Sequence, residues 1–240
     1  MMEETPDKKS LRNEIAKEFQ VERLILFSDA VFAIVITLVA IEIRMPESDE
    51  NLSADEWWQQ FKHLFPLLIA YLVSFLIIGN TWYRHLKLFG FVKTFDKGLV
   101  VRNLLMLFFI GLFPFSISII TAGKVLYGPY FVYILLVLLG NIAQYVLQYY
   151  VLVQRPDLRN NLPIGDALND MRRSRFMLIC MVVLSSFTVV TFLLISVEEM
   201  KPIAFWWMML MPVMRRFYRP KKALPVLPAE TSDENLPAKE

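Results

Sequence analysis

Arg23-Leu-Ile-Leu-Phe-Ser-Asp29 continues into the apolar run Ala-Val-Phe-Ala-Ile-Val-Ile-Thr-Leu-Val-Ala-Ile41. About 20 consecutive, mainly apolar residues are enough to cross the hydrocarbon core of a bilayer as a helix. Asp29 lies about a third of the way along, and an ionised carboxylate at the centre of a membrane helix costs about 2.5–3.5 kcal/mol on insertion scales. We therefore expect Asp29 to face protein or water.

A helical wheel divides this stretch into two opposite sides, because successive residues turn by about 100°. One side is an apolar stripe formed by Arg23, Phe27, Val31, Ile34, Leu38 and Ile41. The other side is smaller and more polar, and it is formed by Asp29, Ala33, Ile36 and Ala40. Small residues let membrane helices approach closely, so the second side is the predicted packing face. A stripe like the first one ordinarily faces lipid or a neighbouring helix.

The composition identifies the class of protein. Hydrophobic residues make up 56% of the 240 residues, which predicts an all-α, polytopic membrane protein. The single Cys180 excludes an intrachain disulfide, and two histidines without a cysteine cluster argue against a zinc site. We expect no cofactor, no nucleic-acid partner and no enzyme activity. Ser28 and Asp29 point about 100° apart on a helix, so they could hardly form a catalytic triad with His85.

The apolar runs and the basic loops predict the topology. Six spans are expected, at about 21–43, 64–82, 99–120, 125–151, 176–197 and 203–214, the last being short for a full crossing. Lys and Arg cluster in alternate connections, which places both termini in the cytoplasm by the positive-inside rule. The expected divisions are a cytoplasmic segment 1–20, a transmembrane domain 21–217 and a disordered cytoplasmic tail 218–240.

Polar side chains from three predicted spans lie at one level of the inner leaflet. Asp29 lies about 9–12 Å in from Val21 at a rise of 1.5 Å per residue. Trp82 and His85 are at the cytoplasmic end of the second span, and Asn103 is near the start of the third. A buried Asp needs donors such as His or Arg. One interpretation is a structural cluster that locks the three helices together, and the other is a direct proton or ion relay.

Several of these residues carry a resemblance to a known family. Arg-x-x-x-Phe-Ser-Asp, followed by Ala33-Ile-x-x-Thr-Leu38, resembles the start of the transmembrane protein 175 family of potassium channels. Two further stretches agree with it, Gly79-Asn-Thr-Trp-Tyr-Arg-His85 and Asn103-Leu-Leu-Met-Leu with Pro114-Phe115 downstream. The motif positions are Arg23, Phe27, Ser28, Asp29, Trp82, His85 and Asn103. The resemblance is specific over residues 21–116 and weaker beyond them.

The resemblance implies a pore lined by the first helix. Bulky aliphatic residues at the matching positions Ile34, Leu38 and Ile41 would form its narrowest part, with Thr37 as a ring of hydroxyls beside them. A narrow apolar neck can gate by dewetting. The Thr-Val-Gly-Tyr-Gly loop that forms the filter of ordinary potassium channels does not occur in the sequence. One six-span repeat resembles the bacterial branch of the family, which implies a homotetramer in the cell membrane.

Glu42 and the acidic loop after it form the predicted outer mouth. A charged mouth would raise the local cation concentration by electrostatic focusing. Ordinary solubility explains the acidic loop equally well.

The resemblance thus implies a potassium-selective, leak-like cation channel that conducts monovalent cations passively. The alternative is a proton-coupled secondary transporter that uses Arg23, Asp29 and His85. Transporters usually carry inverted repeats and broken helices near the midplane, and neither is evident in the sequence. A third hypothesis is a helical membrane scaffold, in which the stripe is a seam between subunits.

Overall fold

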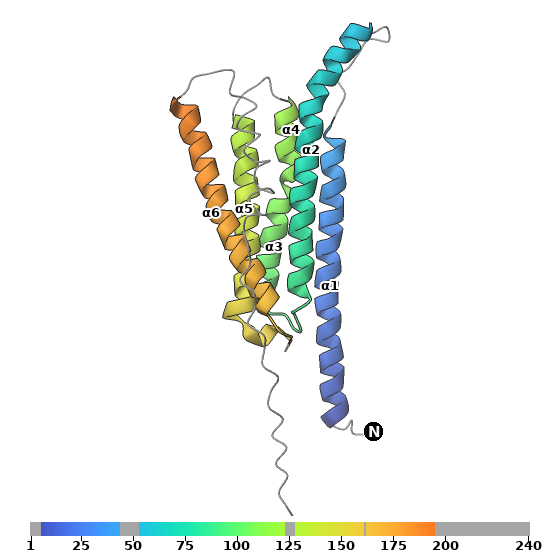
Figure 1. Cartoon of the computed structure of the whole chain (residues 1–240). Helices are drawn as coiled ribbons and strands as arrows, with labels where there is room; N and C mark the ends of the chain where they lie inside the picture. Colours follow the sequence, from blue (N-terminus) through green and yellow to red (C-terminus); the bar gives the residue numbers. More distant parts are fainter. Residues whose placement is uncertain (1–5, 44–52, 123–127, 161, 195–240) are drawn as a thin grey trace, which may run out of the picture.

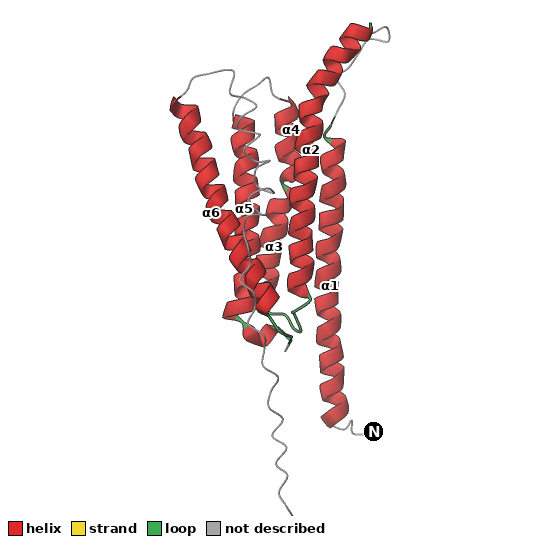
Figure 2. Ribbon diagram, viewed as in Figure 1, coloured by secondary structure: helices red, strands yellow, loops and turns green. Residues whose placement is uncertain are grey.

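The chain folds into a bundle of long helices packed side by side (Figure 1). The computed structural model describes residues 6–43, 53–122, 128–160 and 162–194. The helices are α1 (Pro6–Ile41), α2 (Ala54–Phe89), α3 (Lys97–Gly111), α4 (Phe113–Ala122), α5 (Gly128–Tyr149) and α6 (Gly165–Leu194). A π-helical turn, Tyr150–Gln154, extends α5, and a 3-10 turn, Pro156–Leu158, follows it. Figure 2 shows no strand in the described residues, so the all-α prediction is confirmed.

The helices alternate in direction along the bundle. α1, then α3 with α4, and α6 run one way, and α2 and α5 run the other way (Figure 1). Three described stretches are long and apolar enough to cross a membrane, namely Ile15–Ile41, Lys97–Ile119 and Phe131–Gln154. The predicted sixth span and the predicted tail lie outside the described residues.

α1 is longer than the predicted first span. It begins at Pro6 and runs without interruption past residue 20, where the sequence suggested a boundary. Pro favours the first position of a helix, and the residues after it are mostly good helix formers without Gly or Pro. The first turns of α1 extend beyond the end of the other helices (Figure 1).

The predicted third span consists of two helices, although its stretch Lys97–Ile119 is long and apolar enough for one crossing. α3 ends at Gly111 and α4 begins at Phe113. Pro114 has no backbone N–H to donate to the preceding turn, so the regular helical ladder is interrupted there. Leu112 N–H bonds the Phe109 carbonyl at 3.3 Å, a tighter i to i−3 contact. The break therefore follows from one residue.

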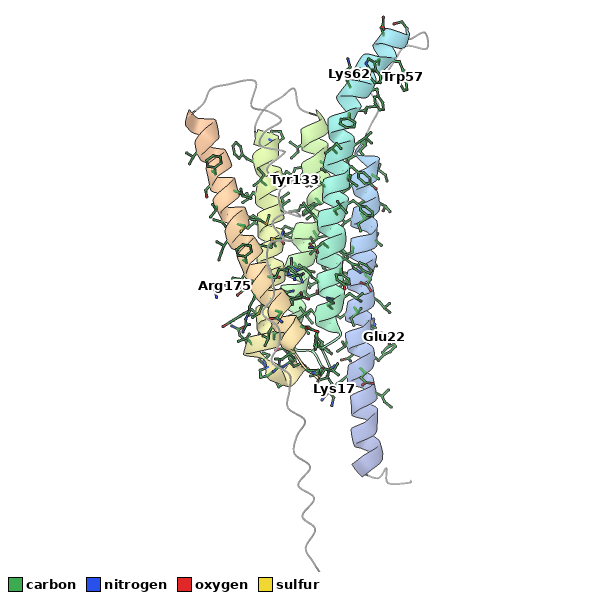
Figure 3. The ribbon with its side chains drawn as sticks, viewed as in Figure 1. Lys17, Glu22, Trp57, Lys62, Tyr133 and Arg175 are labelled. Atoms are coloured by element: carbon green, nitrogen blue, oxygen red, sulfur yellow. The ribbon has the colours of Figure 1, made fainter. Side chains whose placement is uncertain are left out.

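The interior of the bundle combines apolar packing with a few paired polar groups. α3 packs along α5, and α1 packs against α2 and α3. The largest fully buried apolar side chains include Phe32, Ile78, Leu99, Met106 and Ile110. Burying a side chain of this size stabilises a soluble protein by about 1.5–3 kcal/mol, whereas in lipid close packing and hydrogen bonds carry more of the stability. Accordingly, buried Ser74 and Tyr133 form a hydrogen bond between α2 and α5, with their hydroxyl oxygens 2.9 Å apart. Tyr133 is labelled in Figure 3.

A polar lock joins α3 to the end of α5. Asp96 caps α3 by accepting a hydrogen bond from Leu99 N–H at 2.7 Å. Its other carboxylate oxygen accepts from the Tyr150 hydroxyl at 2.6 Å and from Arg155 Nη1 at 2.8 Å. Burial alone would raise the pKa of Asp96, but the bonds from Tyr150 and Leu99 and the charge of Arg155 outweigh it and lower that pKa. The Asp96 carboxylate is therefore ionised at neutral pH.

Gly98 lets Tyr150 lie directly against the first turn of α3. A Cβ at this position would overlap the Tyr150 hydroxyl and lie 2.7 Å from its Cζ atom. We expect Gly98→Ala to displace Tyr150 and to destabilise the protein by about 1–3 kcal/mol, the usual cost of overpacking. The measurement is the thermal midpoint of the detergent-purified protein.

Gly79→Ala is the matched control, because nothing lies within 4 Å of a Cβ built at Gly79. Alanine is favoured over glycine inside a helix by about 1 kcal/mol, so this midpoint should hold or rise. Equal losses in both variants would contradict the assigned role of Gly98.

Candidate functional site: the polar cluster and exposed stripe of α1

α1 packs on the bundle through one apolar face. Its buried residues are Val21, Ser28, Phe32, Val35 and Val39, each at most 6% exposed. This face includes none of the residues of the predicted packing side.

The predicted packing side is only partly correct within the subunit, because Asp29 bonds Trp82 and Ile36 packs against the core, whereas the two alanines do not take part. Ala33 and Ala40 are exposed, and Asp29 and Ile36 are only half-buried. The reason is size. Phe32 and the two valines offer far more surface for close packing than alanines do, and contacts of this kind drive helix association in lipid. The buried face lies roughly 100° from each of the two sides that the wheel distinguished.

Three buried side chains connect α1, α2 and α3. Asn103 Nδ2 donates to Ser28 Oγ at 2.9 Å, and Ser28 Oγ donates onward to the Leu24 carbonyl at 2.8 Å. Asn103 Oδ1 lies 2.8 Å from His85 Nε2. Since the amide oxygen can only accept, His85 donates from Nε2–H in this arrangement. Ser28, His85 and Asn103 are all 0% exposed.

Aromatic rings hold His85 in place. Its ring centroid lies 4.3 Å from that of Phe89 and 5.6 Å from that of Phe32. The imidazole is thus enclosed by apolar rings on α1 and α2 while its Nε2–H reaches α3. Its orientation is fixed by packing as well as by hydrogen bonding.

Asp29 is bound by a different donor from the one expected. Trp82 Nε1–H donates to Asp29 Oδ1 at 2.8 Å, so an indole takes the place of the predicted His or Arg. Asp29 follows Ser28 in the chain, so this pair lies beside the buried network. Arg23 and Phe27 are exposed and lie outside both hydrogen-bonded groups.

The apolar stripe of α1 has little cover within the subunit. Phe27 is 51% exposed, Ile34 57%, Leu38 41% and Ile41 63%. Asp29 lies on the other side of the buried face from this stripe and is hydrogen-bonded to Trp82 of α2. This bond and the buried face together fix the rotation of α1 about its axis. The stripe is therefore presented outward by a helix that the polar cluster fixes in place.

Thr37 is exposed beside this stripe. Its hydroxyl donates to the Ile34 carbonyl at 2.8 Å and lies 3.2 Å from the Ala33 carbonyl. The hydrogen is used within the helix, so the lone pairs of the oxygen remain available as acceptors. Glu42 follows the last residue of α1 and is half-buried.

Sequence reasoning missed the lock around Asp96. Its partners Tyr150 and Arg155 are more than fifty residues away along the chain. A local signal existed, because Asp is a favoured residue immediately before the first turn of a helix. No metal-binding group of three or more His, Cys, Asp or Glu occurs among the described residues.

Comparisons with known proteins agree with the family indicated by the sequence. Residues 23–114 match the family model described as the endosomal/lysosomal potassium channel TMEM175. A potassium channel of Streptomyces collinus is 36% identical over 98 residues, which cover 41% of this chain and 46% of that protein. A potassium channel of a Chryseobacterium species is 30% identical over 126 residues, 52% of this chain and 62% of that protein. The chain thus spans about half the length of these relatives.

A solved structure shares the fold. The crystal structure of a lysosomal potassium-selective channel TMEM175 homolog from Chamaesiphon minutus gives a TM-score of 0.63 at 23% identity. The match covers 82% of this chain and 98% of that one. The chain therefore shares the helical fold of this structure, and its residues 23–114 are similar to the TMEM175 family model. The resemblance predicted from the sequence is confirmed over residues 23–114.

Proposed function

We propose that the chain is one subunit of a potassium-selective, leak-like cation channel whose pore is lined by α1. The observation that carries this proposal is the exposed stripe of α1, on a helix oriented by the polar cluster. The family model and the bacterial relatives are named as channels rather than enzymes. Ile34, Leu38 and Ile41 would then form a constriction around the pore axis.

The three sides of α1 suit a ring of subunits. A helix that lines a shared pore must contact its own subunit, the pore axis and the neighbouring subunit. The buried face meets the first need, and the stripe supplies the second. The small exposed side with Ala33 and Ala40 allows the close approach of a neighbouring helix. We propose a homotetramer, as expected for the single-repeat branch of the family.

The constriction would act through width and wetting. Aliphatic side chains offer no ligand to an ion, and a narrow apolar neck holds water poorly. An ion can pass only if the neck is wide enough for the ion to keep part of its hydration shell. The acceptor lone pairs of Thr37 would replace some of that water, which favours a cation over an anion.

The remaining features concern placement in the membrane. We propose six spans, both termini in the cytoplasm and a location in the cell membrane. The basic residues of the α2–α3 and α5–α6 connections support this orientation by the positive-inside rule. The sequence lacks the Thr-Val-Gly-Tyr-Gly loop, so α1 rather than a pore loop would determine selectivity.

The experiment is reconstitution of the purified protein in planar bilayers with unequal K⁺ and Na⁺ on the two sides. We expect unitary currents that reverse close to the K⁺ equilibrium potential. The proton-coupled transporter would instead give saturable uptake that collapses when the pH gradient is removed, without unitary currents. That second result would refute the channel proposal.

Glu42→Gln tests the outer mouth. Removing the carboxylate should lower inward cation conductance at low ionic strength and change little at high salt. The reason is that a charged mouth is screened over about 10 Å at 0.1 M salt and over about 3 Å at 1 M. Single-channel conductance at both ionic strengths is the measurement. Equal reductions at both would exclude electrostatic focusing.

A further inference from the structure

A cavity lies where the chain turns from α5 into α6. Its volume is about 400 Å³, and it is lined by Pro156, Arg159, Asn160, Leu162 and Ile164. The lining combines one guanidinium and one amide with three apolar side chains. No residue of the α1 stripe lines it, and the proposed pore does not use it.

Arg159 has an unmet hydrogen-bonding requirement. Its Nη1 atom is buried and has no acceptor, and none of the described carboxylates pairs with it. A buried donor without an acceptor is costly, the more so when it carries charge. The neighbouring Arg155 differs, because Asp157 binds its Nε and Nη2 atoms at 3.0 and 2.8 Å and Asp96 binds its Nη1. Arg155 therefore serves the structure, whereas Arg159 is available to a ligand.

The backbone around Arg159 is held firmly. Lys93 N–H donates to the Leu158 carbonyl at 2.8 Å, and Asn160 N–H donates to the Phe91 carbonyl at 2.9 Å. The Asn160 side chain donates to the Gly90 carbonyl at 3.1 Å. These bonds tie the α5–α6 connection to the α2–α3 connection on both sides of Arg159. A binding group on such a support loses little freedom when a ligand arrives.

The local charge favours an anion. Residues 84–102 and 155–175 carry ten basic and four acidic side chains. Three of the acids are already paired, since Asp96 and Asp157 bind Arg155 and Asp170 lies 3.4 Å from Lys87. Asp166, in the first turn of α6, opposes an anion. The positive end of the α6 dipole and the surplus of basic side chains favour an anion.

We propose that Arg159 anchors a site for a phosphate-type oxyanion in this cavity. A guanidinium binds phosphate oxygens with paired, charge-assisted hydrogen bonds. The apolar lining accommodates the neighbouring carbon atoms of a phospholipid headgroup, although a free phosphate offers the same oxyanion. This end of the bundle carries the basic loops, which the positive-inside rule places at the cytoplasmic surface. Anionic lipids in that leaflet would supply phosphate headgroups at high local concentration.

The test measures ligand-dependent stability of the full chain in detergent. Dioctanoyl phosphatidic acid is the probe, dioctanoyl phosphatidylcholine controls for the acyl chains, and inorganic phosphate serves as competitor. Arg159→Gln removes the proposed anchor. Arg175→Gln removes the same charge from an exposed position on α6 (Figure 3). We expect phosphatidic acid to raise the thermal midpoint saturably in the wild type and in Arg175→Gln. Arg159→Gln should need at least about tenfold more ligand.

Competition by millimolar inorganic phosphate identifies a soluble ligand, and its failure identifies the lipid headgroup. Equal responses of the two variants, or an equal response to phosphatidylcholine, would overturn the proposal. If Arg159→Gln does not fold, phenylglyoxal labelling of the wild type provides the test. Phosphatidic acid should protect Arg159 and leave Arg175 reactive, and equal labelling with and without the lipid would refute the site.

Discussion

Replacing Ile34 or Leu38 by alanine is expected to raise potassium current and weaken the discrimination between K⁺ and Na⁺. Both side chains are 41–57% exposed on the subunit, so truncating them should change stability by no more than about 0.5 kcal/mol. The effect arises in the pore, where a wider neck holds more water and lets a hydrated ion pass. We expect the permeability ratio to fall by about tenfold, equivalent to about 1.4 kcal/mol. Asn at either position should act in the same direction, because it wets the neck despite similar bulk.

Ile36→Ala is the matched control for this experiment. Ile36 lies on the same helix but is half-buried and packs against the core. Its truncation should lower the thermal midpoint and leave the reversal potential unchanged. Reversal potentials of all the variants in planar bilayers make the comparison. A shift in selectivity at Ile36 without one at Ile34 or Leu38 would place the pore elsewhere.

Asn103→Leu is expected to cause the largest loss of folded protein. Asn103 supplies both the acceptor for His85 and the donor for Ser28. Leucine keeps the bulk but leaves the buried His85 N–H without its acceptor, at about 1–3 kcal/mol, and removes one of the two hydrogen bonds of Ser28, at about 0.5–1.5 kcal/mol. The combined cost of about 1.5–4.5 kcal/mol is a large part of the whole stability of many domains. Size-exclusion profiles and thermal midpoints in detergent measure it.

Asn80→Leu controls for the loss of an amide from a membrane helix. Asn80 is half-buried on α2, and no hydrogen bond of its side chain is observed among the described residues. This variant should keep a normal elution profile. A double-mutant cycle between Ser28→Ala and Asn103→Ala should yield a coupling energy of about 0.5–3 kcal/mol. No coupling, or equal losses at Asn80 and Asn103, would show that the cluster does not join the helices.

The level of the polar cluster could be predicted from the sequence, because helical rise fixes the depth of each residue along antiparallel spans. Ser28, His85 and Asn103 meet where counting residues from the ends of the spans places them. The rotation of α1 could not be predicted in the same way. It depends on which side chains fill the interior, and Phe32 and Val35 prevail over Ala33 and Ala40. The indole of Trp82, rather than His85, reaches Asp29 as a consequence of that rotation.

The surroundings of Pro114 and of Asp96 differ in how far the local sequence predicts them. The break between α3 and α4 lies beside Pro114, and the prediction of the third span gave its limits without this interruption. The lock of Asp96 with Tyr150 and Arg155 joins residues far apart in the chain, and neither partner has a motif that announces it. Contacts of this kind depend on how α3 and α5 pack together.

A pore enclosed by α1 helices from several copies of the chain is the arrangement that most needs a direct test. The most direct measurement is a cryo-electron microscopy reconstruction of the purified protein in detergent or nanodiscs. We expect a particle with fourfold symmetry, in which Ile34 and Leu38 lie nearest the axis and Ala33 and Ala40 face the adjacent subunit. A single-copy particle, or an assembly with α6 at the axis and the stripe of α1 against lipid, would contradict it.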